Sequence, residues 1–282
     1  RYRGRPGIFA YDLLNEPDET FFVNLTNPGN ASISDDQGTG TILNDDAQPA
    51  ISVNNVSVTE GNAGTTNANF TVSLSAPSGQ TVTVDFATAN GTATAGSDYA
   101  AGSGTVTFTP GATSQTVAVA VNGDVTNEAN ETFFVNLTGP TNATISDAQG
   151  QGTILNDDAE PGLSIDDVSL SEGNAGTSDA TFTVSLSAAS GQTVTVNFAT
   201  ANGTATAGSD YVSTSGMLTF PPATTTQTVT VTVNGDLLNE VNETFFVNLS
   251  GEVNATISDA QGQGTITNDD PEPSITINDV SV

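Results

Sequence analysis

The sequence contains no cysteine, no histidine and no lysine, and its three arginines all lie within the first five residues. Without cysteine and histidine, zinc sites of the usual kind, thiol nucleophiles and imidazole bases are excluded. The absence of lysine also excludes Schiff-base chemistry and lysine–asparagine isopeptide cross-links. Packing, hydrogen bonds and bound metal are left as the sources of stability.

Positively charged side chains are almost absent. Asp and Glu total 32, whereas residues 6–282 contain no basic side chain at all. Such a surface repels nucleic acid and anionic membranes, because binding either of them requires Lys or Arg to neutralise phosphate. No apolar run approaches the roughly 20 residues of a membrane span, and the apolar stretch 7–10 is too short for the core of a signal peptide. We therefore expect cations as ligands, no nucleic-acid partner and no direct membrane insertion.

A repeat organises what is present. The motif Asn156-Asp157-Asp158 also occurs at 44–46 and at 268–270, so that the three copies are equally spaced along the chain. A regular period of this kind indicates tandem copies of one module, and each period is long enough for its own core. The predicted division is 1–46, the C-terminal part of a module with an atypical start at 1–10; 47–158 and 159–270, two complete modules; and 271–282, the first strand of a further module.

Alternating apolar residues predict β-strands throughout each module. Val82, Val84 and Phe86 illustrate the two-residue period, and glycine- and proline-containing turns such as Pro77-Ser78-Gly79 separate the segments. The pattern predicts seven strands per module in an all-β, antiparallel, immunoglobulin-like sandwich, with the modules arranged as an end-to-end array. The phase of the first strand shifts between Val53 and Val56, which indicates a bulge or kink.

The acidic residues gather at one end of this predicted sandwich. If successive strands alternate in direction, six of the nine carboxylates of module 47–158 lie in loops at the same end, and all six recur at the equivalent positions of module 159–270. The candidate ligands are Glu60, Asp98, Asp124, Glu128, Asp157 and Asp158, and then Glu172, Asp210, Asp236, Glu240, Asp269 and Asp270. Asp147 and its counterpart Asp259 fall at the opposite end.

Six carboxylates with no basic side chain nearby repel one another. Two unit charges about 4 Å apart repel by roughly 4 kcal/mol at an intermediate dielectric constant. Protonation or bound cations can offset this cost. Ca²⁺ suits the pattern better than Mg²⁺, because it accepts 6–8 oxygen ligands in flexible geometry. The alternative is a set of solvated loop acids on an acidic, salt-tolerant protein.

Several motifs resemble the Calx-beta domain, which was first named from the sodium–calcium exchanger and is common in bacterial surface proteins. They include Val58-Thr59-Glu60-Gly61, Gly96-Ser97-Asp98-Tyr99 and Asn156-Asp157-Asp158. The resemblance implies a seven-stranded sandwich that binds Ca²⁺ at one end through the twelve residues named above. The exchanger pattern has more Asp at 122–124 and 156–158, which implies fewer or weaker ions here.

We therefore predict a non-catalytic, calcium-binding stalk, spacer or fibre of a large extracellular bacterial protein. Its partners are neighbouring modules and possibly identical chains in a fibre, with short proline-containing linkers at 47–49 and 159–161. The spacing of Glu128 and Glu131 allows a glycosidase acid pair, but no sugar cleft is evident. The alternative functions are a calcium-dependent adhesive module that binds a glycan or a cell-surface receptor, and an accessory domain of a secreted enzyme.

Overall fold

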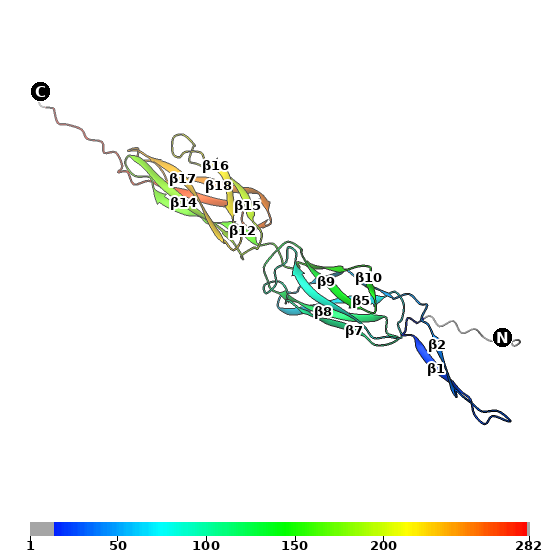
Figure 1. The fold of residues 1–282 in the computed structure, drawn as a ribbon. Coiled ribbons are helices and arrows are strands. Elements are labelled where there is room, and N and C mark those ends of the chain that lie inside the picture. Colours follow the sequence, from blue (N-terminus) through cyan, green and yellow to red (C-terminus); the bar gives the residue numbers. More distant parts are fainter. Residues whose placement is uncertain (1–13, 281–282) are drawn as a thin grey trace, which may run out of the picture. The chain divides into compact units, whose positions relative to one another are not determined.

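A computed structural model describes residues 14–280, so the predicted atypical segment 1–10 lies outside the described residues. Within this range the chain forms β-strands and loops only, and no helix is present that could cross a membrane. Residue contacts divide it into two compact units. The first contains residues 14–124 and 130–155, and the second contains residues 125–129 and 156–280. Each unit holds one β-sandwich (Figure 1).

The sandwich of the first unit consists of a four-stranded sheet in the order β10-β3-β5-β8 and a five-stranded sheet in the order β4-β11-β9-β6-β7. Its strands are β3 (Ala50–Val53), β4 (Val56–Thr59), β5 (Gly64–Leu74), β6 (Val82–Asn90), β7 (Ser103–Phe108), β8 (Ser114–Gly123), β9 (Glu131–Thr141), β10 (Thr144–Ile145) and β11 (Gln149–Leu155).

The sandwich of the second unit repeats this arrangement, with sheets β17-β14-β12-β19 and β13-β20-β18-β15-β16. Its strands are β12 (Gly162–Ile165), β13 (Val168–Ser171), β14 (Gly176–Leu186), β15 (Val194–Asn202), β16 (Ser215–Phe220), β17 (Thr226–Gly235), β18 (Glu243–Val253), β19 (Thr256–Ile257) and β20 (Gln261–Thr267). The predicted all-β sandwich is therefore confirmed.

The core of the second sandwich is centred on Phe245. Its ring is fully buried, stacks on Tyr211 with a centroid distance of 4.7 Å and meets Phe182 edge-on at 5.9 Å. Gly264 of β20 lies opposite Phe245 on β18. A Cβ atom at this glycine would overlap the phenylalanine ring, so the strand needs glycine there. The alternation read from the sequence thus buries one face of each strand between the two sheets.

The first strand differs from the prediction. The phase shift between Val53 and Val56 is a complete break, because β3 joins one sheet and β4 joins the other. The sandwich is also not purely antiparallel, since β4 pairs in parallel with β11 and β3 pairs in parallel with β10. The first and last strands of a module run in the same direction, so their pairing as neighbours is necessarily parallel.

Two end segments lack a sandwich of their own among the described residues. β1 (Glu19–Asn24) and β2 (Gln37–Ile42) pair only with each other, and Phe21 on β1, the counterpart of Phe245, is 51% exposed. Residues 271–280 form no strand, and Ile275 is 99% exposed. The predicted first strand at 271–282 is therefore unpaired as far as it is described. The boundaries at residues 46, 158 and 270 stay predictions.

Candidate metal centre

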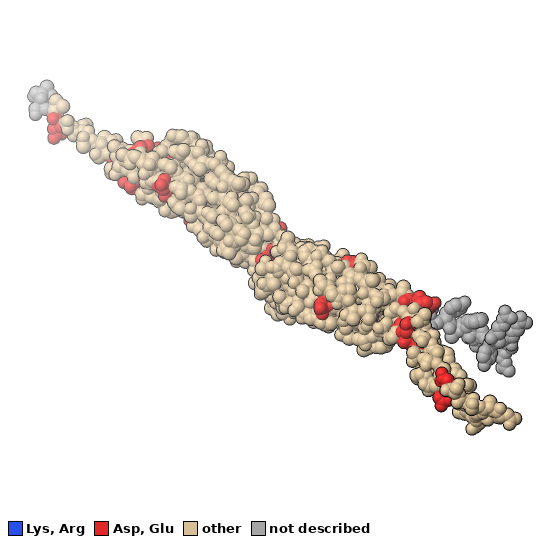
Figure 2. All heavy atoms as spheres, viewed as in Figure 1, with Lys and Arg blue, Asp and Glu red and all other residues tan. Residues whose placement is uncertain are grey.

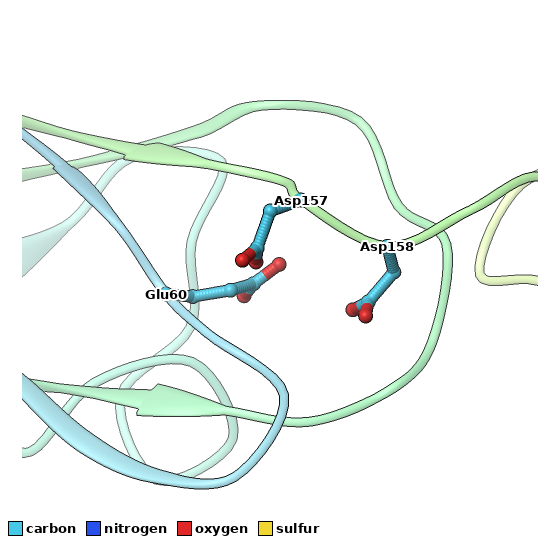
Figure 3. Close-up of side chains that lie close together, drawn as sticks. All are labelled: Glu60, Asp157 and Asp158. Carbon is cyan, nitrogen blue, oxygen red and sulfur yellow. The ribbon is translucent and has the colours of Figure 1, made fainter.

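Four groups of three carboxylates lie in the described residues, two in each repeat. Within a group, each residue contributes one carboxylate oxygen, and these oxygens lie within 4.8 Å of one another. The groups are Glu60, Asp157 and Asp158 (Figure 3); Asp98, Glu128 and Glu131; Glu172, Asp269 and Asp270; and Asp210, Glu240 and Glu243. In Figure 3 the side chains of Glu60 and Asp157 point toward each other from two different chain segments.

Parallel strand pairing builds the group around Glu172. Strand β13 ends at Ser171, which pairs with Thr267 at the end of β20. The amide of Glu172 donates to the carbonyl oxygen of Thr267 at 3.3 Å. Because parallel neighbours end at the same edge of a sheet, the residues that follow both strands meet there. Gly235 approaches the backbone of Glu172 so closely that a Cβ atom would overlap it.

Asp270 provides the clearest structural evidence for a cation site. The residue is only 6% exposed, and its Oδ2 is buried without a hydrogen-bond partner. Its Oδ1 accepts a hydrogen bond from the side-chain amide of Asn174. Buried polar oxygens in folded proteins are nearly always paired, and a carboxylate oxygen is a preferred ligand of hard cations. The group around Asp270 therefore fits a cation.

The second group of this repeat joins a turn to the start of β18. Asp210 lies in the turn after β15, where its Oδ2 accepts a hydrogen bond from the amide of Thr206 at 2.6 Å. Glu243 is the first residue of β18. Burial, the negative charge of Asp210 and a hydrogen bond with it raise the pKa of Glu243 to about 7. Burial, followed by the charges of Asp236 and other neighbouring acids, also raises the pKa of Glu172.

Ten of the twelve predicted site residues belong to these four groups. Asp124 and Asp236 are exposed residues after β8 and β17 and lie outside the groups. Two further members, Glu131 and Glu243, were not predicted as ligands. They begin β9 and β18, and strand direction places those starts at the same end as the other acids. The signal that could have identified them is the spacing from Glu128 to Glu131, which the next repeat preserves from Glu240 to Glu243.

Asp147 and Asp259, which the sequence predicts at the opposite end of each sandwich, lie where strand direction placed them. Asp147 and Asp259 lie two residues before the starts of β11 and β20, whereas the carboxylate groups lie beyond the other ends of these strands. Asp259 is exposed and accepts a hydrogen bond from the amide of Gln261. In Figure 2, Asp and Glu form separate groups on the visible face, and no Lys or Arg appears among the described residues. No basic side chain of this part of the chain therefore offsets the carboxylate groups.

Comparison with known proteins identifies the family of this chain. The sequence model of the Calx-beta domain matches residues 43–160 and 156–271, which together make up most of the chain. The chain belongs to the Calx-beta family. Both family matches contain one complete repeat with its two carboxylate groups. The resemblance inferred from the motifs is therefore confirmed as far as tandem Calx-beta domains are concerned.

The relatives that this chain matches in sequence include sodium/calcium exchangers. Sodium/calcium exchanger 1 of Canis lupus familiaris is 30% identical over 191 residues, which cover 60% of this chain and 19% of the exchanger. Sodium/calcium exchanger 2 of Homo sapiens is 33% identical over 188 residues, which cover 59% and 20%. The chain thus spans about a fifth of the length of these relatives. The crystal structure of CBD12 from CALX1.2 is 18% identical, with a TM-score of 0.38, over 77% of this chain and 99% of that one.

The raised pKa values predict a pH dependence in the absence of metal. The folded-state pKa of Glu243, about 7, exceeds the unfolded value of roughly 4.3. Its stabilising contribution is therefore complete below the unfolded pKa and is lost as pH rises through about 7. In EDTA, we expect the thermal midpoint of the chain to fall between about pH 5 and about pH 8. Glu243→Gln should reduce this fall, whereas Asp259→Asn should not. A midpoint that rises over this range would contradict the assignment.

Proposed function

We propose that this chain is a non-catalytic, calcium-binding part of a larger protein, in which Ca²⁺ braces one end of each Calx-beta sandwich. The single observation that carries the proposal is the buried, unpartnered Oδ2 of Asp270 within a group of three carboxylates. The same group is present in the preceding repeat, and residues 6–282 contain no basic side chain that could neutralise it.

The ligands would come from all four groups. In the second repeat, Glu172, Asp269 and Asp270 would hold one ion, and Asp210, Glu240 and Glu243 would hold another. A bound Ca²⁺ supplies positive charge and accepts the carboxylate oxygens that burial and mutual repulsion otherwise penalise. The same ion links loops that are distant in the sequence, because each group draws its residues from two chain segments. Asp124 and Asp236 would contribute through their charge.

A stalk, spacer or fibre of an extracellular bacterial protein is the context that we infer for this calcium binding. Three features support it. The two complete repeats carry the same acidic set, the linker residues Pro49 and Pro161 are buried, and the chain is acidic and free of cysteine. In this role the partners are neighbouring modules and identical chains. The adhesive alternative, with a glycan or receptor as ligand, requires a divergent exposed patch in one module, and no described feature favours it.

The mechanical part of this proposal can be tested by scattering. Asp157 and Asp158 lead directly into the linker 159–161, so a cation held there restricts the direction in which the chain leaves the first repeat. We expect small-angle scattering of the full chain to show a narrower distribution of maximum dimensions in millimolar Ca²⁺ than in EDTA. Asp157→Asn combined with Asp158→Asn should abolish this narrowing.

Asp269→Asn combined with Asp270→Asn is the matched control. It makes the same change at the end of the second repeat, where residues 271–280 form no strand, and it should preserve most of the narrowing. Equal distributions in Ca²⁺ and EDTA for the unsubstituted chain would show that calcium has no mechanical role.

A further inference from the structure

The loop before β9 contains a buried asparagine, Asn127, which accepts hydrogen bonds from the turn 190–192 of the following repeat. Asn127 is 5% exposed and belongs to the same compact unit as the turn at residues 190–192. Its carbonyl oxygen accepts hydrogen bonds from the hydroxyl of Ser190 at 3.1 Å and from the amide of Gly191 at 3.0 Å. Its Oδ1 accepts from the side-chain amide of Gln192 at 3.1 Å.

The side-chain NH₂ group of Asn127 forms a hydrogen bond within its own repeat. Its Nδ2 donates to the carbonyl oxygen of Asp158 at 3.0 Å. The turn is equally close to the adjacent residue Glu128, because a Cβ atom added to Gly191 would lie 2.8 Å from the Cγ atom of this glutamate. One asparagine therefore joins the end of one repeat to a Ser-Gly-Gln turn, and the glycine of the turn allows the close approach.

The same contact occurs a second time, within the first compact unit. Asn15 and the turn Ser78-Gly79-Gln80 form the corresponding three hydrogen bonds, at 3.1, 3.1 and 3.2 Å. The Nδ2 of Asn15 donates to the carbonyl oxygen of Asp46 at 2.9 Å. Both asparagines and both serines are buried. Two separate instances with one set of bonds indicate a matched pair of surfaces.

The third copy of the asparagine, Asn239, has only one of these four hydrogen bonds. Asn239 donates from Nδ2 to the carbonyl oxygen of Asp270 at 2.8 Å, but its side chain is exposed. Among the described residues, nothing donates a hydrogen bond to its carbonyl oxygen or to Oδ1. An open groove of about 410 Å³ adjoins it and is lined by Leu237, Leu238, Asn239, Glu240, Pro271 and Pro273.

We propose that the loop 237–240 is a docking surface for the Ser-Gly-Gln turn of a further Calx-beta sandwich of this kind. Such a turn offers three donors, which are the serine hydroxyl, the glycine backbone amide and the glutamine side-chain amide. They would donate to the carbonyl oxygen and the Oδ1 of Asn239, as the corresponding donors do to Asn15 and Asn127. The contact uses no carboxylate–cation bond and does not require calcium. The docking itself does not depend on the proposed array. Its biological role does rest on that proposal, because in an array the same contact would connect each module to the next.

The docking is weak between separate molecules and effective within one chain. Three hydrogen bonds over a small area leave little net affinity once the entropy lost when two free molecules associate is subtracted. A short linker raises the effective concentration of the partner to the millimolar range. We therefore expect a dissociation constant on the order of millimolar for a partner in solution, which NMR titration detects.

Residues 47–282 are a suitable partner, because β1 and β2 pair only with each other and every strand of both sandwiches lies between residues 50 and 267. Without Asn15, the turn 78–80 of this fragment is free. In EDTA, the unlabelled fragment should shift the resonances of Asn239 and Glu240 in the ¹⁵N-labelled full chain in a saturable manner. The same fragment with Ser78→Ala and Gln80→Ala should bind at least about tenfold more weakly.

The unlabelled full chain is a second control, because its own Asn15 occupies the turn 78–80 and the shifts should be correspondingly small. Absence of shifts at millimolar fragment, or equal shifts with the substituted fragment, would overturn the docking surface. Because the titration contains EDTA, either result leaves the calcium proposal untouched, and a failure of calcium binding leaves this test intact.

Discussion

Millimolar Ca²⁺ is expected to raise the thermal midpoint of the full chain by about 10 °C above its value in EDTA. A ligand that binds only the folded state at 100 times its dissociation constant stabilises that state by about 2.7 kcal/mol. For a domain of about 100 residues, each kcal/mol shifts the midpoint by roughly 4–8 °C. The groups around Asp270 and Glu243 combine buried, half-buried and exposed carboxylates that repel one another without metal, and relief of this repulsion is one source of the affinity for Ca²⁺. Differential scanning calorimetry in Ca²⁺ and in EDTA measures this shift of the thermal midpoint.

A pair of substitutions separates a specific site from general screening of an acidic protein. Asp270→Asn removes a negative charge from the group with the unpartnered oxygen, and the Ca²⁺-dependent gain of the second sandwich should fall by more than half. Asp259→Asn removes the same charge from an exposed position at the other end of β20, and the gain should persist. Equal losses in the two variants, or no gain in the unsubstituted chain, would rule out the proposed site.

The second large effect is expected from Phe245→Ala, which should destabilise the second sandwich by about 3–5 kcal/mol. The ring of Phe245 is fully buried against Tyr211 and Phe182, and Gly264 opposite it cannot fill the cavity. The substitution also loosens the start of β18, where Glu243 lies. Urea denaturation followed by circular dichroism should show one of the two sandwiches unfolding at a much lower midpoint.

Phe21→Ala is the control that the repeat itself supplies. Phe21 occupies the same position in the repeat on β1, but its ring is 51% exposed, so the urea midpoints should change little. A similar loss for both variants would mean that Phe21 is packed in solution. An unchanged midpoint for Phe245→Ala would contradict the assignment of this ring to the core.

Most of the fold could be predicted, because two kinds of local information agree. The alternation of apolar residues identifies the strands, and their alternating direction places the acidic loops at one end. The parallel pairing of β4 with β11 could not be predicted in this way. Which strands become neighbours depends on packing between the two sheets, and the apolar pattern of a strand is the same for either direction of its partner.

The candidate site was predicted at the level of loops and less well at the level of residues. Glu243 was missed because it belongs formally to a strand, although it is the first residue of that strand and projects among the loop acids. Asp236 was included because it follows a strand at the correct end, yet it lies outside the groups. Strand direction gives the end of the sandwich on which a residue lies. The direction of a side chain within a loop depends on turn geometry, which the sequence pattern does not encode.

The pairing of β13 with β20 also determines how a sandwich resists force. β13 lies near the start of its repeat, β20 lies at the end, and the two strands are parallel, with paired residues from Val168 and Gly264 to Ser171 and Thr267. Tension applied to the two ends of the chain pulls these strands in opposite directions along their length. The hydrogen bonds between them are then sheared together instead of being unzipped one at a time. Extension of the chain is therefore limited by the forced-unfolding rate of each sandwich, and this parallel pair acts as its mechanical clamp.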